Sequence, residues 1–264
     1  MNVTETPTRF SEDVVVVTGS TRGIGQAIAH RFAAEGADVV ITGRSEEAGI
    51  AVSESITGGD GTAQFHPTDL RSTDDIDTLF QHIAEKYGEL DILVNNAAVQ
   101  TETAVTEATL EEWDRVVETG FRAYWRCARA AVPLMETGAI INISSNHAMQ
   151  TMPAHFPYNA VKGAVNGLTR AMALDLGPAI RVNTVSPGWV GVDRTLAPME
   201  DADLRRLEAV HPLGRIGTPA DVAGAVTFLA SEDAAFMTGS EMVVDGGRSV
   251  VLQDDALPDY TDQE

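Results

Sequence analysis

Lysine is almost absent from this chain. Of the 18 basic residues among 264, only Lys86 and Lys162 are lysines, and 39 residues are acidic. The resulting formal net charge of −21 would repel nucleic acid and anionic membrane surfaces, so we expect neither as a partner. Such acidity also suggests a halophilic protein from a salt-rich cytoplasm, because salt screens the self-repulsion of the surface. An acidic protein from an ordinary cell is the alternative.

Cysteine and long apolar runs are equally scarce. Cys127 is the only cysteine, so an internal disulfide is impossible and a reducing compartment is expected. The N-terminus is polar and acidic, unlike a secretory signal, and no apolar run approaches the roughly 18 to 20 residues that cross a bilayer. We therefore expect a cytoplasmic protein.

Composition and spacing favour one domain over residues 1–264. Apolar residues make up 44% of the chain, enough for a buried core, and nothing in the middle resembles a linker. Residues 1–11 and about 252–264 are expected to be flexible tails. The stretch 191–212 carries Pro198 and has no strand pattern, so we predict that it is a mobile substrate lid.

Apolar β-branched runs alternate with amphipathic stretches, which predicts an α/β fold with a doubly wound, Rossmann-type parallel sheet of about seven strands and helices on both faces. The predicted strands are residues 14–17, 39–41, 64–66, 92–94, 140–143, 182–185 and 242–244. The predicted helices are residues 23–35, 46–56, 73–87, 109–135, 157–176 and 219–230. Sites in such sheets lie at the carboxyl ends of the strands.

The first strand runs into a glycine-rich segment that precedes a helix. Its residues are Gly19, Ser20, Thr21, Arg22, Gly23, Ile24 and Gly25. Glycine lets the backbone approach a pyrophosphate, and the helix start supplies free N–H donors, so this segment predicts a phosphate loop. A glycine-rich turn without a ligand is the alternative.

The end of the second strand indicates which dinucleotide is preferred. Gly43 stands where an acidic residue would bind the ribose hydroxyls of NAD, whereas Arg44 and Arg22 would suit a 2′-phosphate. We therefore favour NADP(H) over NAD(H), which stays possible because either arginine could be a solvated surface charge.

Tyr158 and Lys162 are four residues apart in a predicted helix, and Ser145 ends a predicted strand. Positions i and i+4 share one helix face, so the ammonium can favour the ionised phenol and make it a usable acid or base. An ordinary helical pair is the alternative, but a lysine in so lysine-poor a chain suggests chemistry that arginine cannot perform.

Further motifs follow the later strands in a fixed order. They are Asp69-Leu70, Asn95-Asn96-Ala97-Ala98, Asn142-Ile143-Ser144-Ser145, Ser186-Pro187-Gly188, Pro212-Leu213-Gly214-Arg215 and Asp245-Gly246-Gly247. With the glycine loop, Tyr158 and Lys162, they make the chain resemble the short-chain dehydrogenase/reductase family in its single-domain form, over about residues 12 to 249.

The resemblance implies roles for individual residues. Ser145 would bind the substrate oxygen, Tyr158 would exchange its proton, and Lys162 would bind the nicotinamide ribose. The remaining cofactor contacts implied by the resemblance are Asp69, Leu70, Asn96, Ala97, Pro187, Gly188 and Val190. It also suggests a homotetramer.

Three positions depart from the family pattern. Gly120 stands where the family usually has an asparagine that holds a water beside the lysine, and Ala98 and Val192 replace a usual glycine and threonine. A helical glycine costs about 0.5 to 1 kcal/mol relative to alanine. We expect Gly120 either to leave room for an extra water or to let the helix bend; an impaired proton relay is the alternative.

The segment between Ser145 and Tyr158 is polar and would line a substrate pocket in this fold. Together with Gln100, His147 and Trp189, it suggests a small-molecule substrate such as a sugar, sugar acid or polyol. Reduction of a 3-oxoacyl thioester and a catalytically silent NADP(H)-binding sensor are the alternatives. The spacing of histidines and acidic residues predicts no metal site.

Overall fold

The computed structural model describes residues 8–59 and 61–251, and its centre is one parallel sheet in the order β3-β2-β1-β4-β5-β6-β7. The strands are β1 (Val14–Val17), β2 (Asp38–Gly43), β3 (Thr62–Pro67), β4 (Ile92–Asn95), β5 (Gly138–Ile143), β6 (Ile180–Pro187) and β7 (Glu241–Val244). The predicted doubly wound fold with seven strands is confirmed. Its winding direction changes between β1 and β4, where ligands bind in such sheets.

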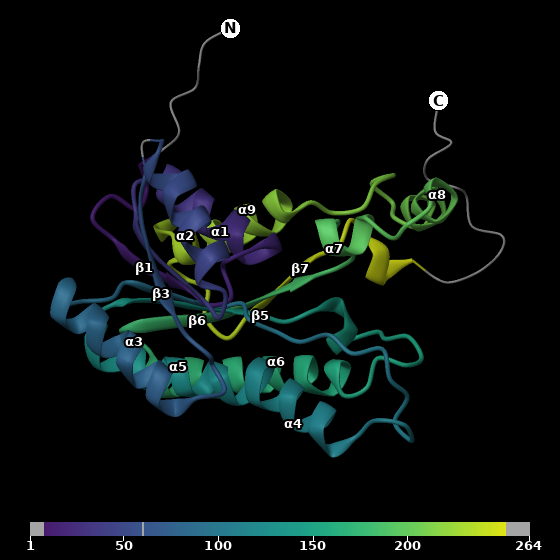
Figure 1. The fold of residues 1–264 in the computed structure, drawn as a ribbon, viewed down its shortest axis with the longest axis horizontal. Coiled ribbons are helices and arrows are strands. Elements are labelled where there is room, and N and C mark those ends of the chain that lie inside the picture. The colour runs from purple at the N-terminus through teal and green to yellow at the C-terminus, as the bar shows by residue number, and fades with distance from the viewer. Residues whose placement is uncertain (1–7, 60, 252–264) are drawn as a thin grey trace, which may run out of the picture.

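Helices cover both faces of this sheet (Figure 1). One layer holds α1 (Gly23–Ala34), α2 (Glu46–Thr57) and α9 (Pro219–Ala230). The opposite layer holds α3 (Thr73–Lys86), α4 (Leu110–Val117), α5 (Ala123–Ala131) and α6 (Tyr158–Leu176).

The strand β1 shows why the sequence folds this way. All four of its valines are buried; Val15 and Val17 pack into the core beneath α1 and α9, and Val14 and Val16 into the core beneath α3 and α5. Side chains of a strand alternate between faces, so a continuous apolar run stabilises both layers at once. Each buried valine contributes about 1.5 kcal/mol or more.

A chain of buried polar groups fixes α6 on the sheet. Asn95 Nδ2 donates to Asn142 Oδ1 at 2.9 Å, and Asn142 Nδ2 donates to Thr169 Oγ1 at 2.9 Å. The hydroxyls of Thr169 and Thr184 lie 2.7 Å apart. These bonds connect β4, β5, α6 and β6, and because all four residues are buried, each bond satisfies a group that water cannot reach.

The predicted single helix over residues 109–135 is interrupted. After α4 the chain forms a π-helix, Glu118–Arg122, then α5, then a 3₁₀ turn, Val132–Leu134. Gly120 is buried within the π-helix, which supports the expectation that glycine at this position lets the helix deviate. A Cβ on Gly120 would lie 3.1 Å from Val161 Cγ1, so Val161 limits the space beside the glycine on that side.

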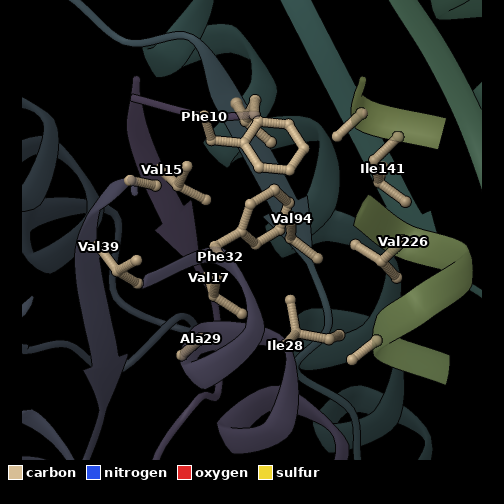
Figure 2. Packing of buried hydrophobic residues seen from close by; sticks show 14 of the residues in the cluster. Phe10, Val15, Val17, Ile28, Ala29, Phe32, Val39, Val94, Ile141 and Val226 are labelled. Carbon is tan, nitrogen blue, oxygen red and sulfur yellow. The ribbon is translucent and has the colours of Figure 1, made fainter. Parts of the chain in front are cut away.

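The first described residues belong to the folded domain. Phe10 is 2% exposed, and its ring packs edge-on against Phe32 with centroids 4.8 Å apart (Figure 2). The buried Glu35 accepts hydrogen bonds from Arg9, at 2.6 Å, and from Arg31. The expectation that residues 1–11 form a flexible tail is therefore wrong for residues 8–11, because an aromatic side chain anchors them. The expected tail at about 252–264 lies outside the described residues.

The predicted lid region contains two short helices, α7 (Asp193–Leu196) and α8 (Asp201–Ala209). The remaining 3₁₀ turns are Asn146–Ala148, Glu232–Ala234 and Arg248–Val250. Among the described residues, no helix is both long and apolar enough to span a membrane.

Replacing Phe10 by alanine should lower the free energy of unfolding by about 3 kcal/mol, because the change opens a cavity against Phe32. Urea unfolding, followed by circular dichroism, measures this loss. Phe236→Ala is the matched control, since Phe236 is fully exposed and its truncation should cost less than about 0.5 kcal/mol. Equal losses in the two variants would show that Phe10 does not anchor the terminus.

Candidate active site

A cleft of about 1650 Å³ opens at the carboxyl ends of β1 to β4. The predicted site residues that line it are Gly19, Thr21, Arg22, Gly23, Ile24, Gly25, Arg44, Asp69, Leu70, Asn96, Ala97 and Gln100. The structure thus brings together loops that are far apart in the sequence, at the point where strand order reverses.

The glycine loop offers backbone rather than side chains to this cleft. Gly19 and Gly23 have φ values of 62° and 57°, and a Cβ on Gly19 would lie 2.9 Å from Ala97 Cα. No side chain caps the start of α1, so its first N–H groups remain free to bind an anion. The structure therefore provides a cradle that suits a pyrophosphate.

Ser20 plays a different part from its neighbours. Its side chain is buried, donates to Val17 O at 2.6 Å and accepts from Thr42 N at 3.0 Å. These bonds fasten the loop to β2, and the Ser20 hydroxyl is turned away from the cleft.

Asn96 ties the glycine loop to the end of β4. Its Nδ2 donates to Thr18 O at 2.8 Å and to Gly19 O at 3.1 Å, while its backbone N–H donates to Thr18 Oγ1 at 2.8 Å. Asn96 therefore holds the loop in shape. Thr18 is a positioning residue that sequence reasoning missed, although a threonine directly before Gly19 was its visible signal.

The part of the cleft beside the ends of β2 and β3 is rich in arginine. A Cβ on Gly43 would lie 2.6 Å from Thr21 Cγ2, so Thr21 occupies the space that an acidic side chain at position 43 would need. Asp69 Oδ2 accepts from Arg71 Nη2 at 2.6 Å, and this pair lowers the pKa of Asp69. Arg71 also lines the cleft but was not among the predicted contacts.

The side chain of Lys162, on α6, reaches the end of β5, away from solvent. It is 1% exposed, and its Nζ donates to Ile143 O at 2.7 Å. The Tyr158 ring centroid lies 5.6 Å from the same nitrogen. Burial lowers the pKa of Lys162 to about 7, because the charged form loses its hydration.

His147 links Ser145, His155 and Tyr158 at this strand end. Ser145 is 5% exposed, and its Oγ accepts from His147 N at 3.2 Å. The His147 ring stacks on His155 with centroids 4.5 Å apart and meets the Tyr158 ring edge-on at 6.1 Å. Burial, followed by the neighbouring His155, lowers the pKa of His147, which favours a neutral imidazole. The predicted Ser145, Tyr158 and Lys162 are thus gathered around one strand end.

The residues after β6 approach the cleft from the opposite side. Gly188 N donates to Val244 O, and Trp189 O accepts from Gly217 N, both at 2.9 Å, while Val190 bridges to Gly217. The Val192 side chain lies 3.4 Å from the point that a Cβ on Gly23 would reach. The predicted lid therefore begins directly over the glycine loop, although Pro187, Gly188, Trp189 and Val190 are outside the cleft lining.

No group of three or more His, Cys, Asp or Glu residues within the described chain has an arrangement that could hold a metal ion.

The stability that depends on Lys162 should rise with pH. The folded pKa of about 7 lies below the ordinary 10.5, so between these values the unfolded chain binds a proton that the folded chain does not. The unfolding free energy of the wild type should gain up to about 1.4 kcal/mol per pH unit relative to Lys162→Met. Urea unfolding of the cofactor-free protein from pH 7 to 10 measures this, with exposed Lys86→Met as control. Parallel curves for Lys162→Met and the wild type would contradict it.

Comparison with known proteins identifies the family. A family profile described as enoyl-(acyl carrier protein) reductase matches residues 19–249. A 3-oxoacyl-(acyl-carrier-protein) reductase from Chlamydia muridarum is 35% identical, and the match covers 88% of this chain and 95% of that protein. A trans-4-hydroxycyclohexanecarboxylate dehydrogenase from Sinomonas cyclohexanicum is 37% identical, with 91% and 94% covered.

A solved structure agrees with these relatives. The crystal structure of a short-chain dehydrogenase/reductase from Brucella melitensis, designated glucose/ribitol dehydrogenase, matches with a TM-score of 0.87 and 30% identity, covering 92% of this chain and 98% of that one. The chain therefore belongs to the short-chain dehydrogenase/reductase family, whose members are oxidoreductases that use nicotinamide cofactors on CH–OH groups.

Proposed function

We propose that this protein is an NADP(H)-linked oxidoreductase acting on a small polar secondary alcohol or ketone such as a sugar, sugar acid or polyol. The observation that carries the proposal is the buried Lys162 ammonium beside the Tyr158 ring, at the strand end that also holds Ser145. A buried lysine costs free energy even when its ammonium is hydrogen-bonded, so its place beside a phenol favours a catalytic purpose over a structural one.

Two side chains would act on the substrate oxygen, and a third would act on one of them. When bound, the cofactor accepts or supplies the hydride. In oxidation, Tyr158 takes the hydroxyl proton while Ser145 hydrogen-bonds the same oxygen and holds it beside the phenol. While it is protonated, Lys162 stabilises the Tyr158 phenolate before the proton moves, and in reduction Tyr158 returns the proton.

The cofactor would occupy the cleft of about 1650 Å³. The glycine loop fits a pyrophosphate because its backbone is open. Position 43, where an acidic residue would bind the ribose hydroxyls of NAD, is a glycine, and the side chain of Thr21 occupies the space beside it. Arg22 and Arg44 would bind a 2′-phosphate. Asp69 and Leu70 would contact the adenine, Asn96 and Ala97 would support the ribose side, and Pro187, Gly188 and Val190 would border the nicotinamide.

The stacked His147 and His155, with Gln100 and Trp189, would form the substrate pocket. Neutral imidazoles and an amide bind hydroxyl groups, which favours a hydroxylated substrate over an apolar one. The Sinomonas relative, named for a small hydroxy acid, supports this class.

We also propose that residues 191–212 move as a lid, that the protein assembles as a homotetramer, and that it works in a salt-rich cytoplasm.

A 3-oxoacyl thioester is the second candidate substrate, favoured by the Chlamydia relative. The net charge of −21 opposes docking of an acidic carrier protein, so we rank this reading second. A thioester carried on coenzyme A rather than on a protein tests it without that repulsion.

Arg44→Ala should raise KM for NADP⁺ about 10- to 100-fold and leave KM for NAD⁺ nearly unchanged, because a charge-assisted hydrogen bond contributes about 1.5 to 3 kcal/mol. Initial rates with each cofactor measure the change. Arg170→Ala is the control, since Arg170 is exposed on α6 and does not line the cleft. Equal effects on both cofactors would refute selection of the 2′-phosphate by Arg44.

Tyr158→Phe should lower kcat about 100- to 10,000-fold, the range for loss of a general acid–base group. The assay follows nicotinamide absorbance in molar KCl over a panel of aldoses, sugar acids, polyols and a 3-oxoacyl coenzyme A, with Tyr87→Phe as the control. Unchanged turnover in Tyr158→Phe would exclude the proposed role. A wild type that binds NADP(H) without turning over any of the panel would favour the silent sensor.

A further inference from the structure

Tyr124 is a fully buried tyrosine that no sequence motif singled out. It lies at the start of α5, directly after the π-helix. Its hydroxyl donates to Ile143 O at 3.1 Å, and the same carbonyl accepts from Lys162 Nζ at 2.7 Å. Lys162 Nζ and the Tyr124 hydroxyl are 3.5 Å apart, so a phenol, an ammonium and a strand-end carbonyl form a closed triangle.

The ammonium also lies between two aromatic rings. The centroids of Tyr124 and Tyr158 are 5.5 Å and 5.6 Å from Lys162 Nζ, within the range of cation–π attraction. Because the Tyr124 hydroxyl donates its hydrogen bond to Ile143 O, its oxygen lone pairs are free to accept a hydrogen bond from the ammonium. The two rings and the hydroxyl therefore replace part of the hydration that Lys162 loses on burial.

The groups that titrate around this triangle are few within the described chain. On α6 the neighbour is Tyr158, on α5 Tyr124 has Cys127 beside it, and β5 contributes the uncharged Ile143 carbonyl. Ser144, directly after β5, donates its hydroxyl to Lys162 O. Burial raises the pKa of Tyr124 well above its ordinary value and that of Cys127 to about 12. Tyr124 therefore stays protonated and acts on Lys162 as a fixed dipole.

Position 120 supplies no polar side chain to Lys162 in this chain. It is a glycine, and Val161 Cγ1 lies 3.1 Å from where its Cβ would be, so Val161 would have to give way by a few tenths of an ångström to a larger side chain. Tyr124 is four residues further along and reaches the lysine directly.

We propose that Tyr124 is a positioning residue whose hydroxyl holds the Lys162 ammonium in place for Tyr158, in a chain that has no side chain at position 120 to do so. The proposal deepens the function proposed above and assigns Tyr124 to the machinery of the same site. Tyr124 touches neither substrate nor cofactor and acts only through Lys162.

The scarcity of lysine makes a direct test possible. Protein labelled with ¹³Cε-lysine gives two signals, from Lys86 and Lys162, and Lys86→Arg assigns them. In Tyr124→Phe, which keeps the ring, the titration midpoint of Lys162 should fall by about 0.5 pH unit or more, because the charged form loses a hydrogen-bond acceptor. An unchanged or raised midpoint in the folded variant would overturn the proposal.

Tyr87→Phe is the matched control. Tyr87 is a half-buried tyrosine whose ring centroid lies 5.0 Å from Lys86 Nζ, so it stands beside the other lysine. The same deletion of a hydroxyl there should leave the Lys162 midpoint within about 0.1 pH unit, since the two sites are separate. A fall in the Lys162 midpoint in both variants would show a global effect and would also overturn the assignment.

Kinetics give a second readout that rests on the proposed function. In Tyr124→Phe the rising limb of kcat for alcohol oxidation should move to higher pH by about 0.5 unit, because a less charged Lys162 favours the Tyr158 phenolate less. A lower unfolding temperature with an unmoved limb and midpoint would assign Tyr124 a structural role only. If the wild type oxidises no alcohol, the proposed function fails, while the lysine titration still decides the role of Tyr124.

Discussion

The hydrogen bond from Lys162 Nζ to the Ile143 carbonyl is the interaction on which the candidate active site depends. An ammonium in the interior must be bound from several sides, and here the last residue of β5 supplies the strongest acceptor. That carbonyl is available because Ile143 ends the strand, where pairing with the neighbouring strand also ends. The end of an interior strand, rather than a loop, therefore fixes the charge beside Tyr158, and this rigid element sets its distance to the phenol.

The same logic explains the polar residues inside the core. The amides and hydroxyls of Asn95, Asn142, Thr169 and Thr184 hold α6 to three strands, and α6 carries both Tyr158 and Lys162. Hydrogen bonds have directions, whereas apolar contacts tolerate sliding, so this network defines the register of α6 on the sheet. Apolar packing makes the domain stable, and the polar chain makes the site reproducible.

The sequence was sufficient for the strands and for most of the loops that line the cleft, since valine runs, glycine turns and strand-end motifs each depend on local rules. Besides Thr18 and Arg71, three features of the fold escaped it. Phe10 anchors a segment expected to be flexible, because its partner Phe32 is close only after folding. The π-helix at Glu118–Arg122 has no periodicity signal of its own. Tyr124 has the sequence pattern of an ordinary core aromatic, and only the folded structure shows its hydrogen bond to Ile143.

The π-helix has a geometric consequence for everything that follows it. Successive residues of an α-helix are rotated by about 100°, so accommodating one additional residue in a turn re-aims each later side chain by that angle. The number of residues between Thr109 and Tyr124 therefore determines which face of α5 meets Lys162, in addition to the identity of those residues. A related chain with an ordinary turn there would direct a tyrosine at the same aligned position elsewhere, so sequence identity at this position and equivalence in space are separate properties.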